Sequence, residues 1–268
     1  MAKLESASPF VRIARRPATA VRLVGMPHPG GGASAYAWWA DALPQWVEVA
    51  AVQLPGREDR IGEPPFQESP ALVRSVADAL QPFVDRPFAL FGHSAGALLA
   101  FETARELHRI AGVRPVALLV SGEAAPHLPR DQAPLHTLPD DELGGQIGLR
   151  GGTPPELLAN PELMELVLPT LRADLAAWET YEFVEGPRLT CPIVALAGAD
   201  DPHVAVGAVD AWREHTTAEF RMHVLSGSHF YLADRREQVP EIVALELREL
   251  VAWVGWPGAL QPPAPDPA

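Results

Sequence analysis

Residues 88–108 of the chain read FALFGHSAGALLAFETARELH, and this stretch decides the fold. The apolar run at 88–91 is typical of a strand buried on both faces, and the segment after Gly96 has the apolar spacing of an amphipathic helix. Gly92 and Gly96 carry no side chain at the turn where the two backbones crowd together. The turn therefore presents the hydroxyl of Ser94 at the start of the helix and leaves the N–H of Ala95 free, an arrangement typical of a nucleophilic serine.

Apolar runs and helix-like segments alternate along most of the chain. We expect strands at 20–25, 47–53, 87–91, 115–120, 192–197 and 219–225, and helices at 69–81, 95–111, 205–214 and 238–253. This alternation favours crossover connections and therefore an α/β fold whose mostly parallel sheet is covered by helices on both faces.

One long segment, residues 130–185, interrupts the alternation. Apolar residues recur there at helical spacing and no strand pattern is present. Asn160 and Pro161 have the residue types expected of an N-cap and the first residue of a helix. We interpret the segment as a helical lid over one end of the sheet.

The length and composition are those of a globular protein with one large α/β domain or two small ones. The chain has 268 residues, of which 47% are hydrophobic, so it can bury a sizeable core. We expect the domain to span 20–256, with an N-terminal extension at 1–19 and a Pro-rich, disordered tail at 257–268, both outside the packed core.

Charge and cysteine content exclude several classes of protein. The net charge of −13 argues against binding to nucleic acid or to acidic membrane surfaces. Cys191 is the single cysteine, so no internal disulfide can form. The sequence shows no signal-peptide pattern and no apolar run of membrane-span length. We therefore expect a cytoplasmic protein, and a monomer.

A serine nucleophile needs a base and an acid that orients the base. His229, in VLSGSHFYL, follows the last expected strand, which is where the chain order serine, acid, histidine places the base. For the acid, Asp200 and Asp201 follow the strand that ends at Gly198, and either could reach His229. Glu123, at the end of the preceding strand, is a third candidate. We prefer Asp201.

A glycine-rich loop, MPHPGGG at 26–32, follows the first strong strand. An acyl-transfer site needs a second backbone donor beside the N–H of Ala95, and a loop in this position supplies it in enzymes with such a serine. Pro29 has no N–H to give. We expect Gly30 to supply the donor, because glycine can adopt the altered backbone that a preceding proline imposes.

Together these segments resemble the type II thioesterases, the stand-alone editing hydrolases that accompany polyketide and nonribosomal peptide assembly lines. The resemblance covers about residues 20–254. It is carried by PHPGGG at 27–32 with the nearby SAY, VQLPGREDR at 52–60, GHSAG at 92–96, LPTLRADLAAWETY at 168–181, GADDP at 198–202 and GSHFYL at 227–232.

The resemblance implies an α/β-hydrolase fold with Ser94 as nucleophile, His229 as base and Asp201 as acid. Two residues depart from the family pattern: Pro29 stands where alanine is usual, and Glu123 where arginine is frequent. The resemblance also places LPGRE, with Arg57, in a loop near the site. Without it we would expect Arg57 in a surface ion pair. In the lid, we expect Arg172 and Asp174 to brace helices.

The activity implied by the resemblance is hydrolysis of acyl thioesters on the phosphopantetheine arms of acyl carrier protein domains, which removes aberrant or stalled acyl units. No metal or bound cofactor is implied. The lid would form an apolar acyl chamber, and the residues expected to contact substrate are His28, Pro29, Trp178, Tyr181 and Phe230. Two alternatives remain: an esterase or lipase of the same fold that acts on small oxygen esters, and a hydrolase-fold receptor without catalysis.

Overall fold

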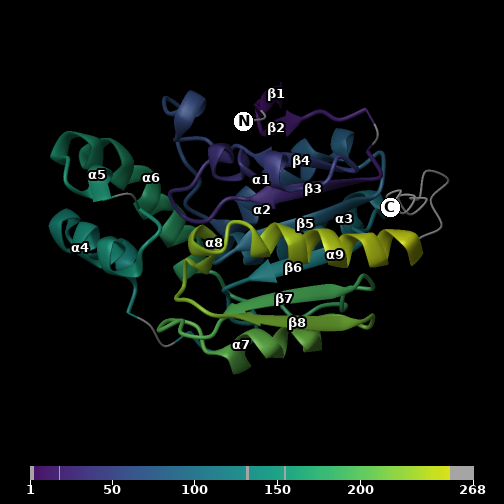
Figure 1. Ribbon diagram of the computed structural model, residues 1–268. Helices are drawn as coiled ribbons and strands as arrows, with labels where there is room; N and C mark the ends of the chain where they lie inside the picture. The colour runs from purple at the N-terminus through teal and green to yellow at the C-terminus, as the bar shows by residue number, and fades with distance from the viewer. Residues whose placement is uncertain (1–2, 18, 131–132, 154, 254–268) are drawn as a thin grey trace, which may run out of the picture.

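An eight-stranded sheet forms the centre of the structure, a computed structural model that describes residues 3–17, 19–130, 133–153 and 155–253 (Figure 1). The strand order is β1-β2-β4-β3-β5-β6-β7-β8, and every neighbouring pair from β4 to β8 is parallel. The strands are β1 (Glu5–Ser8), β2 (Val11–Ala14), β3 (Val21–Met26), β4 (Val47–Val52), β5 (Phe88–His93), β6 (Ala117–Ser121), β7 (Ile193–Gly198) and β8 (Phe220–Leu225).

The six parallel strands confirm the sequence prediction, with ends that shift by one or two residues. β3, β4, β5, β6 and β7 are buried at every position, as their continuous apolar character indicates. β8 lies at the edge of the sheet and is only partly buried. These five buried parallel strands position the turns at the carboxyl end of the sheet.

The N-terminal extension differs from our expectation. Residues expected outside the core form the hairpin β1–β2, and β2 pairs antiparallel with β4 so that Val11 lies opposite Val52. Val11 and Ile13 are fully buried in the main apolar core. Val11 and Ile13 are β-branched and alternate with Arg12, which is typical of a strand. The basic residues and prolines around them hide this short pattern in the sequence.

Helices cover both faces of the sheet (Figure 1). One face packs against α2 (Ser69–Leu80), α3 (Ala95–Ala111), α7 (Val206–Asp210) and the 3-10 helix η5 (Ala211–His215). The other packs against η1 (Ala33–Tyr36), α1 (Trp39–Ala42) and α9 (Gln238–Trp253). Shorter elements are η2 (Glu58–Arg60), η3 (Gln81–Phe83), η4 (Leu135–Thr137) and α8 (Tyr231–Asp234). The predicted helices are confirmed, except that 205–214 is divided into α7 and η5.

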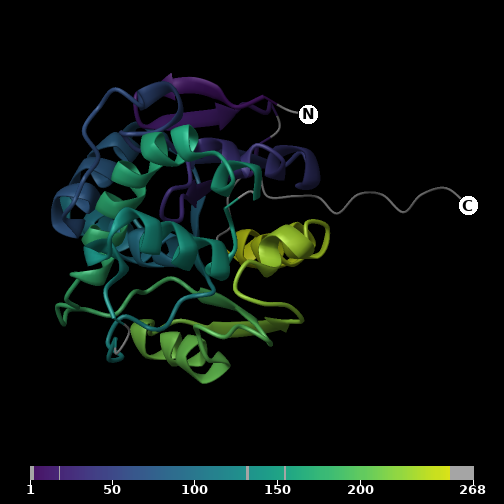
Figure 2. The same ribbon diagram turned by 90° about the vertical axis from the view of Figure 1, so that its left-hand side faces the viewer.

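The segment at 130–185 is helical, as predicted, and lies at one end of the molecule (Figures 1 and 2). Its helices are α4 (Asp140–Arg150), α5 (Pro155–Leu158) and α6 (Pro161–Glu179). Asn160 caps α6, since its side chain accepts the Leu163 N–H at 3.2 Å. The lid has an apolar cluster of its own, which includes Leu135, Leu143, Ile147, Leu168, Leu171 and Leu175.

Within the described ranges, no helix is both long enough and apolar enough to cross a bilayer. The expected Pro-rich tail at 257–268 and the end of the domain at 256 lie outside the described residues.

Candidate active site

The turn between β5 and α3 has the geometry that its sequence predicts. Ser94 has a φ of 54°, which is strained for a residue with a side chain, and α3 begins at the next residue. A Cβ on Gly92 would lie 1.9 Å from the carbonyl oxygen of Gly96, and one on Gly96 would lie 2.7 Å from that of Met26. The backbone is thus too crowded for any side chain at either glycine. The N–H of Ser94 donates to the Ser121 carbonyl on β6 at 2.8 Å, which ties the turn to the sheet.

A buried histidine–carboxylate pair lies beside this turn. His229 Nδ1 is 2.7 Å from Asp201 Oδ2, and the two side chains are only 9% and 1% exposed. The other oxygen, Asp201 Oδ1, accepts the N–H groups of His203 and Val204 at 2.8 and 3.1 Å. Burial opposes ionisation of Asp201, but these hydrogen bonds outweigh it and hold its pKa below the usual value. The carboxylate is therefore ionised and can keep a proton on His229 Nδ1.

The other two acid candidates have different partners. The N–H of Asp200 donates to the Gly227 carbonyl at 3.0 Å, and its side chain accepts the Gly227 N–H at 3.2 Å, so Asp200 braces the loop that carries His229. Glu123 lies 3.5 Å from Arg130, and burial raises the pKa of its carboxyl. The geometry thus favours Asp201, in agreement with our preference.

His93 connects the serine turn with the histidine loop. Its ring centroid is 5.1 Å from that of His229, and its Nδ1 is 3.0 Å from Ser121 Oγ. Ser121 Oγ in turn bonds the hydroxyl of Tyr231. Burial lowers the pKa of His93 well below its usual value, so the ring is neutral at pH 7. Sequence analysis missed this network, because the serine and the tyrosine are separated by 110 residues and carry no motif of their own.

The glycine-rich loop (residues 26–32) lies against the start of α3, but its donors differ from our expectation. The Gly30 N–H donates to Asp174 Oδ2 at 2.8 Å, so it does not face the serine turn. The Gly31 N–H donates to the His28 carbonyl at 2.9 Å, and Pro29 has no N–H. Between described residues, no hydrogen bond starts from the His28 N–H. Gly30 is therefore not a free donor in this arrangement, whereas the His28 N–H is.

Comparisons with known proteins identify the family. The model of the thioesterase domain family matches residues 21–246. The chain belongs to the thioesterase family. It is 43% identical over 224 residues to the thioesterase PikA5 of Streptomyces venezuelae, and the aligned residues cover 83% of this chain and 79% of that protein.

Two solved structures support the same assignment. The type II thioesterase BorB from the borrelidin biosynthetic cluster superposes with a TM-score of 0.81 and 40% identity, covering 91% of this chain and 98% of that one. The thioesterase RedJ from the prodiginine pathway of Streptomyces coelicolor gives a TM-score of 0.82 and 40% identity, covering 90% and 96%. The fold is accordingly the α/β-hydrolase fold, and this thioesterase is a hydrolase that acts on thioesters.

Aromatic rings form one wall beside the His229–Asp201 pair of this thioesterase. The Phe230 ring centroid is 5.1 Å from His229 and 5.5 Å from His28, both in edge-on contacts. The lid covers this wall, since a Cβ on Gly152 would lie 2.3 Å from the Phe230 ring. Burial lowers the pKa of His28 to about 4, so the ring is neutral at pH 7. The structure thus brings His28 and Phe230, both expected to contact substrate, together at the site.

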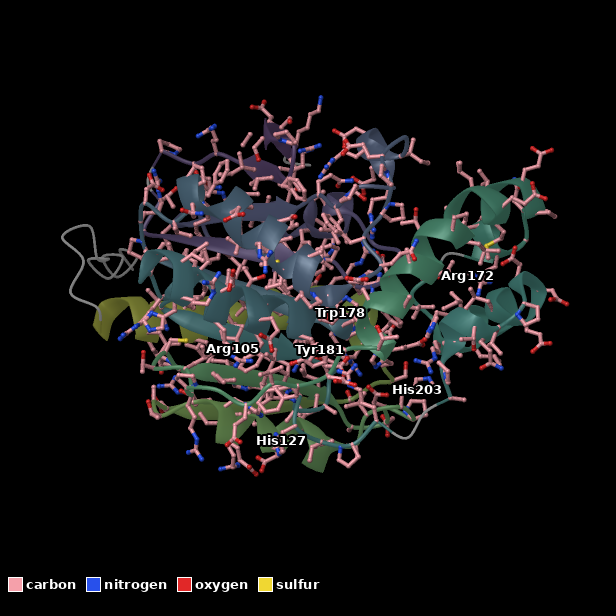
Figure 3. The ribbon with its side chains drawn as sticks, turned by 180° about the vertical axis from the view of Figure 1, so that it is seen from behind. Arg105, His127, Arg172, Trp178, Tyr181 and His203 are labelled. Carbon is pink, nitrogen blue, oxygen red and sulfur yellow. The ribbon has the colours of Figure 1, made fainter. Side chains whose placement is uncertain are left out.

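Trp178 and Tyr181, on and just after α6, contact each other and the main core. Trp178 is buried in the main core, and its ring centroid is 5.8 Å from that of Tyr181. The Tyr181 hydroxyl donates to Glu102 on α3 at 2.7 Å, and Figure 3 shows Tyr181 near Arg105, with Arg172 farther out on the lid. Tyr181 lines a surface groove of about 700 Å³ between α2, α3 and residues 180–184. Contact of these two rings with substrate therefore stays a prediction.

The described residues contain no group of three His, Cys, Asp or Glu side chains arranged to hold a metal ion.

Proposed function

We propose that this protein is a type II thioesterase that removes aberrant or stalled acyl groups from the phosphopantetheine arms of carrier proteins in a polyketide or nonribosomal peptide assembly line. The observation that carries the proposal is the strained Ser94 turn beside the buried His229–Asp201 pair, in a chain of the thioesterase family. The named pathways of BorB and RedJ support this class of substrate.

In the proposed first step, Ser94 Oγ attacks the thioester carbonyl carbon while His229 Nε2 takes the hydroxyl proton. Asp201 stabilises the imidazolium through the Nδ1 hydrogen bond. Collapse of the tetrahedral intermediate breaks the carbon–sulfur bond, and His229 returns the proton to the leaving thiolate. Water, activated by the same histidine, then hydrolyses the acyl-Ser94 ester and releases the free acid.

Two backbone donors stabilise the oxyanion in this proposal. Ala95 is the first residue of α3, so its N–H has no intrahelical acceptor. His28 replaces Gly30 as the second donor, because Gly30 already bonds Asp174. A Cβ placed on Gly96, the residue after Ala95, would lie 3.2 Å from the carbonyl carbon of Pro27, which is bonded to the His28 nitrogen. The N–H groups of Ala95 and His28 are therefore close to each other. Each such donor contributes roughly 3–4 kcal/mol to transition-state stabilisation.

The decisive experiment compares turnover of an acyl-pantetheine thioester with that of the matched oxygen ester. We expect the higher kcat/KM for the thioester, and a further gain when the acyl group is carried on a carrier protein. A strong preference for the oxygen ester would favour the esterase or lipase alternative.

The Ser94→Ala variant addresses the receptor alternative, in which the fold binds a ligand without catalysis. We expect kcat to fall by on the order of 10³-fold or more, because the nucleophile is lost. Parent-level hydrolysis by a folded variant would overturn the catalytic assignment.

We also propose that the enzyme is a cytoplasmic monomer whose partners are carrier proteins and not nucleic acid or membranes. Size-exclusion chromatography with light scattering tests the oligomeric state.

A further inference from the structure

A buried ion pair joins the lid to the loop that follows β4. Arg57 in this loop and Asp174 on α6 have side chains that are only 7% and 6% exposed. Two parallel contacts connect them, Nη1 to Oδ2 at 2.6 Å and Nη2 to Oδ1 at 2.8 Å. This bidentate geometry fixes direction as well as distance. The pair is buried, whereas the residues alone favoured a surface ion pair for Arg57.

Both members of the pair also hold the glycine-rich loop. Asp174 Oδ2 accepts the Gly30 N–H at 2.8 Å, and Arg57 Nη1 donates to the Gly31 carbonyl at 2.9 Å. Leu171, one turn earlier on α6, lies 3.2 Å from where a Cβ on Gly30 would be. The backbone at residues 30 and 31 is therefore fixed by one residue of the lid and one of the sheet region.

Neighbouring contacts strengthen this junction. Thr170 Oγ1 on α6 donates to the Gly56 carbonyl at 2.6 Å, next to Arg57 in the chain. On the other side, Glu58 Oε1 accepts the N–H of Ser34 at 3.2 Å, just beyond the glycine-rich loop. The middle of α6 (residues 170–174), the loop at 54–58 and the glycine-rich loop therefore form one connected unit.

We propose that the Arg57–Asp174 pair positions the glycine-rich loop for catalysis, so that seating of α6 on the domain sets the direction of the His28 N–H. This inference rests on the proposed function, because it requires the loop to supply an oxyanion donor. Pro29 cannot donate, Gly30 is engaged, and the Gly31 N–H holds the His28 carbonyl at 2.9 Å, so the direction of the His28 N–H depends on residues 30 and 31. Arg57 and Asp174 are positioning residues.

The Asp174→Asn variant tests the proposal. An asparagine side chain is neutral and has one acceptor oxygen, so it cannot keep the Gly30 bond and both contacts with Arg57 together, because its NH₂ group would face an Arg57 or Gly30 donor. We expect kcat for the acyl-pantetheine thioester to fall about 10- to 100-fold while KM changes less than threefold. The inhibition constant of an acyl trifluoromethyl ketone, which forms a tetrahedral adduct with the serine, should rise by a similar factor.

Arg172→Gln is the matched control. Arg172 lies on the same helix, and its hydrogen-bond partners, Asp140 and the carbonyls of His136 and Leu138, are all in the lid, so its loss changes the lid without touching the glycine-rich loop. We expect kcat within twofold of the parent. Asp174→Asn leaves the buried charge of Arg57 without its counter-charge, and this variant can therefore fail to fold. The double variant Arg57→Met, Asp174→Leu removes both buried charges and provides a second test in that event. It should show the same loss of kcat.

An unchanged kcat and inhibition constant in the folded Asp174→Asn or double variant would overturn the proposal, as would an equal loss in Arg172→Gln. A parent enzyme that does not hydrolyse thioesters would instead overturn the proposed function, so the two failures are distinguishable.

Discussion

At the scale of single residues, the two adjacent aspartates after β7 show how one position along the chain separates two roles. Asp201 meets the imidazole of His229, whereas Asp200 forms a pair of hydrogen bonds with Gly227 and holds the loop in place. The two residue types are identical, so the motif alone leaves both as candidates. The difference arises from the local turn, where the His203 and Val204 N–H groups bind only Asp201.

This difference predicts unequal effects of the same substitution. Asp201→Asn should lower kcat by on the order of 10⁴-fold, because the amide favours the wrong imidazole tautomer. Asp200→Asn keeps an acceptor for the Gly227 N–H and should lower kcat less than tenfold. Steady-state kinetics on one thioester substrate compares them. Equal losses would contradict the assignment of the acid.

Pro29 gives a second prediction at this scale. Pro29→Ala restores an N–H at that position, but the proposed donors are already the N–H groups of Ala95 and His28. We therefore expect kcat to change less than tenfold, which corresponds to about 1.4 kcal/mol. A larger rise in the measured kcat would mean that the second donor is missing in the parent enzyme.

At the scale of elements, local sequence determines strands and most helices, but contacts between distant segments determine the site. The uninterrupted apolar runs of β5 and β7 predict buried strands, and the Asn160–Pro161 pair predicts the start of α6. The hairpin β1–β2 is masked by basic residues and prolines, so its two short strands were missed. The partner of Gly30 lies 144 residues away, and no local pattern can indicate it.

The helix α4 is the element of the lid with the weakest intrinsic helix propensity, because it contains Gly144, Gly145 and Gly148. A Cβ on Gly145 would meet no atom within 4 Å. Gly145→Ala should therefore stabilise α4 by about 0.5–1 kcal/mol. Hydrogen exchange of the α4 amides should slow relative to the parent. Gly152→Ala is the contrasting variant, since its Cβ would collide with Phe230, and it should speed exchange in α4.

At the scale of the whole molecule, buried histidines couple folding stability to pH, and His28 and His215 are two of them. Burial lowers the pKa of both His28 and His215 to about 4, whereas an unfolded chain has the usual value near 6.5. Between these values the unfolded state binds more protons than the folded state. The free energy of unfolding should therefore rise with pH across this window, and fall as pH decreases from about 6.5 to 4.

Denaturant unfolding at pH 7, 5.5 and 4.5 measures this dependence. His215 lies outside the proposed site and its Nε2 is 2.7 Å from His127 Nδ1, so His215→Gln removes one titrating group at a distance from the chemistry. The variant should lose less stability than the parent between pH 7 and 4.5. Identical pH slopes would show that His215 does not contribute to acid sensitivity.

The antiparallel strand β2 sets a practical boundary for protein production. The family match begins at residue 21 and ends at 246, yet β2 lies before it, and the buried Leu247 and Leu250 of α9 lie after it. A fragment cut at the family boundaries would leave β4 with an open row of backbone donors and acceptors, which is a template for aggregation. The smallest soluble fragment should therefore begin before Glu5 and extend through α9.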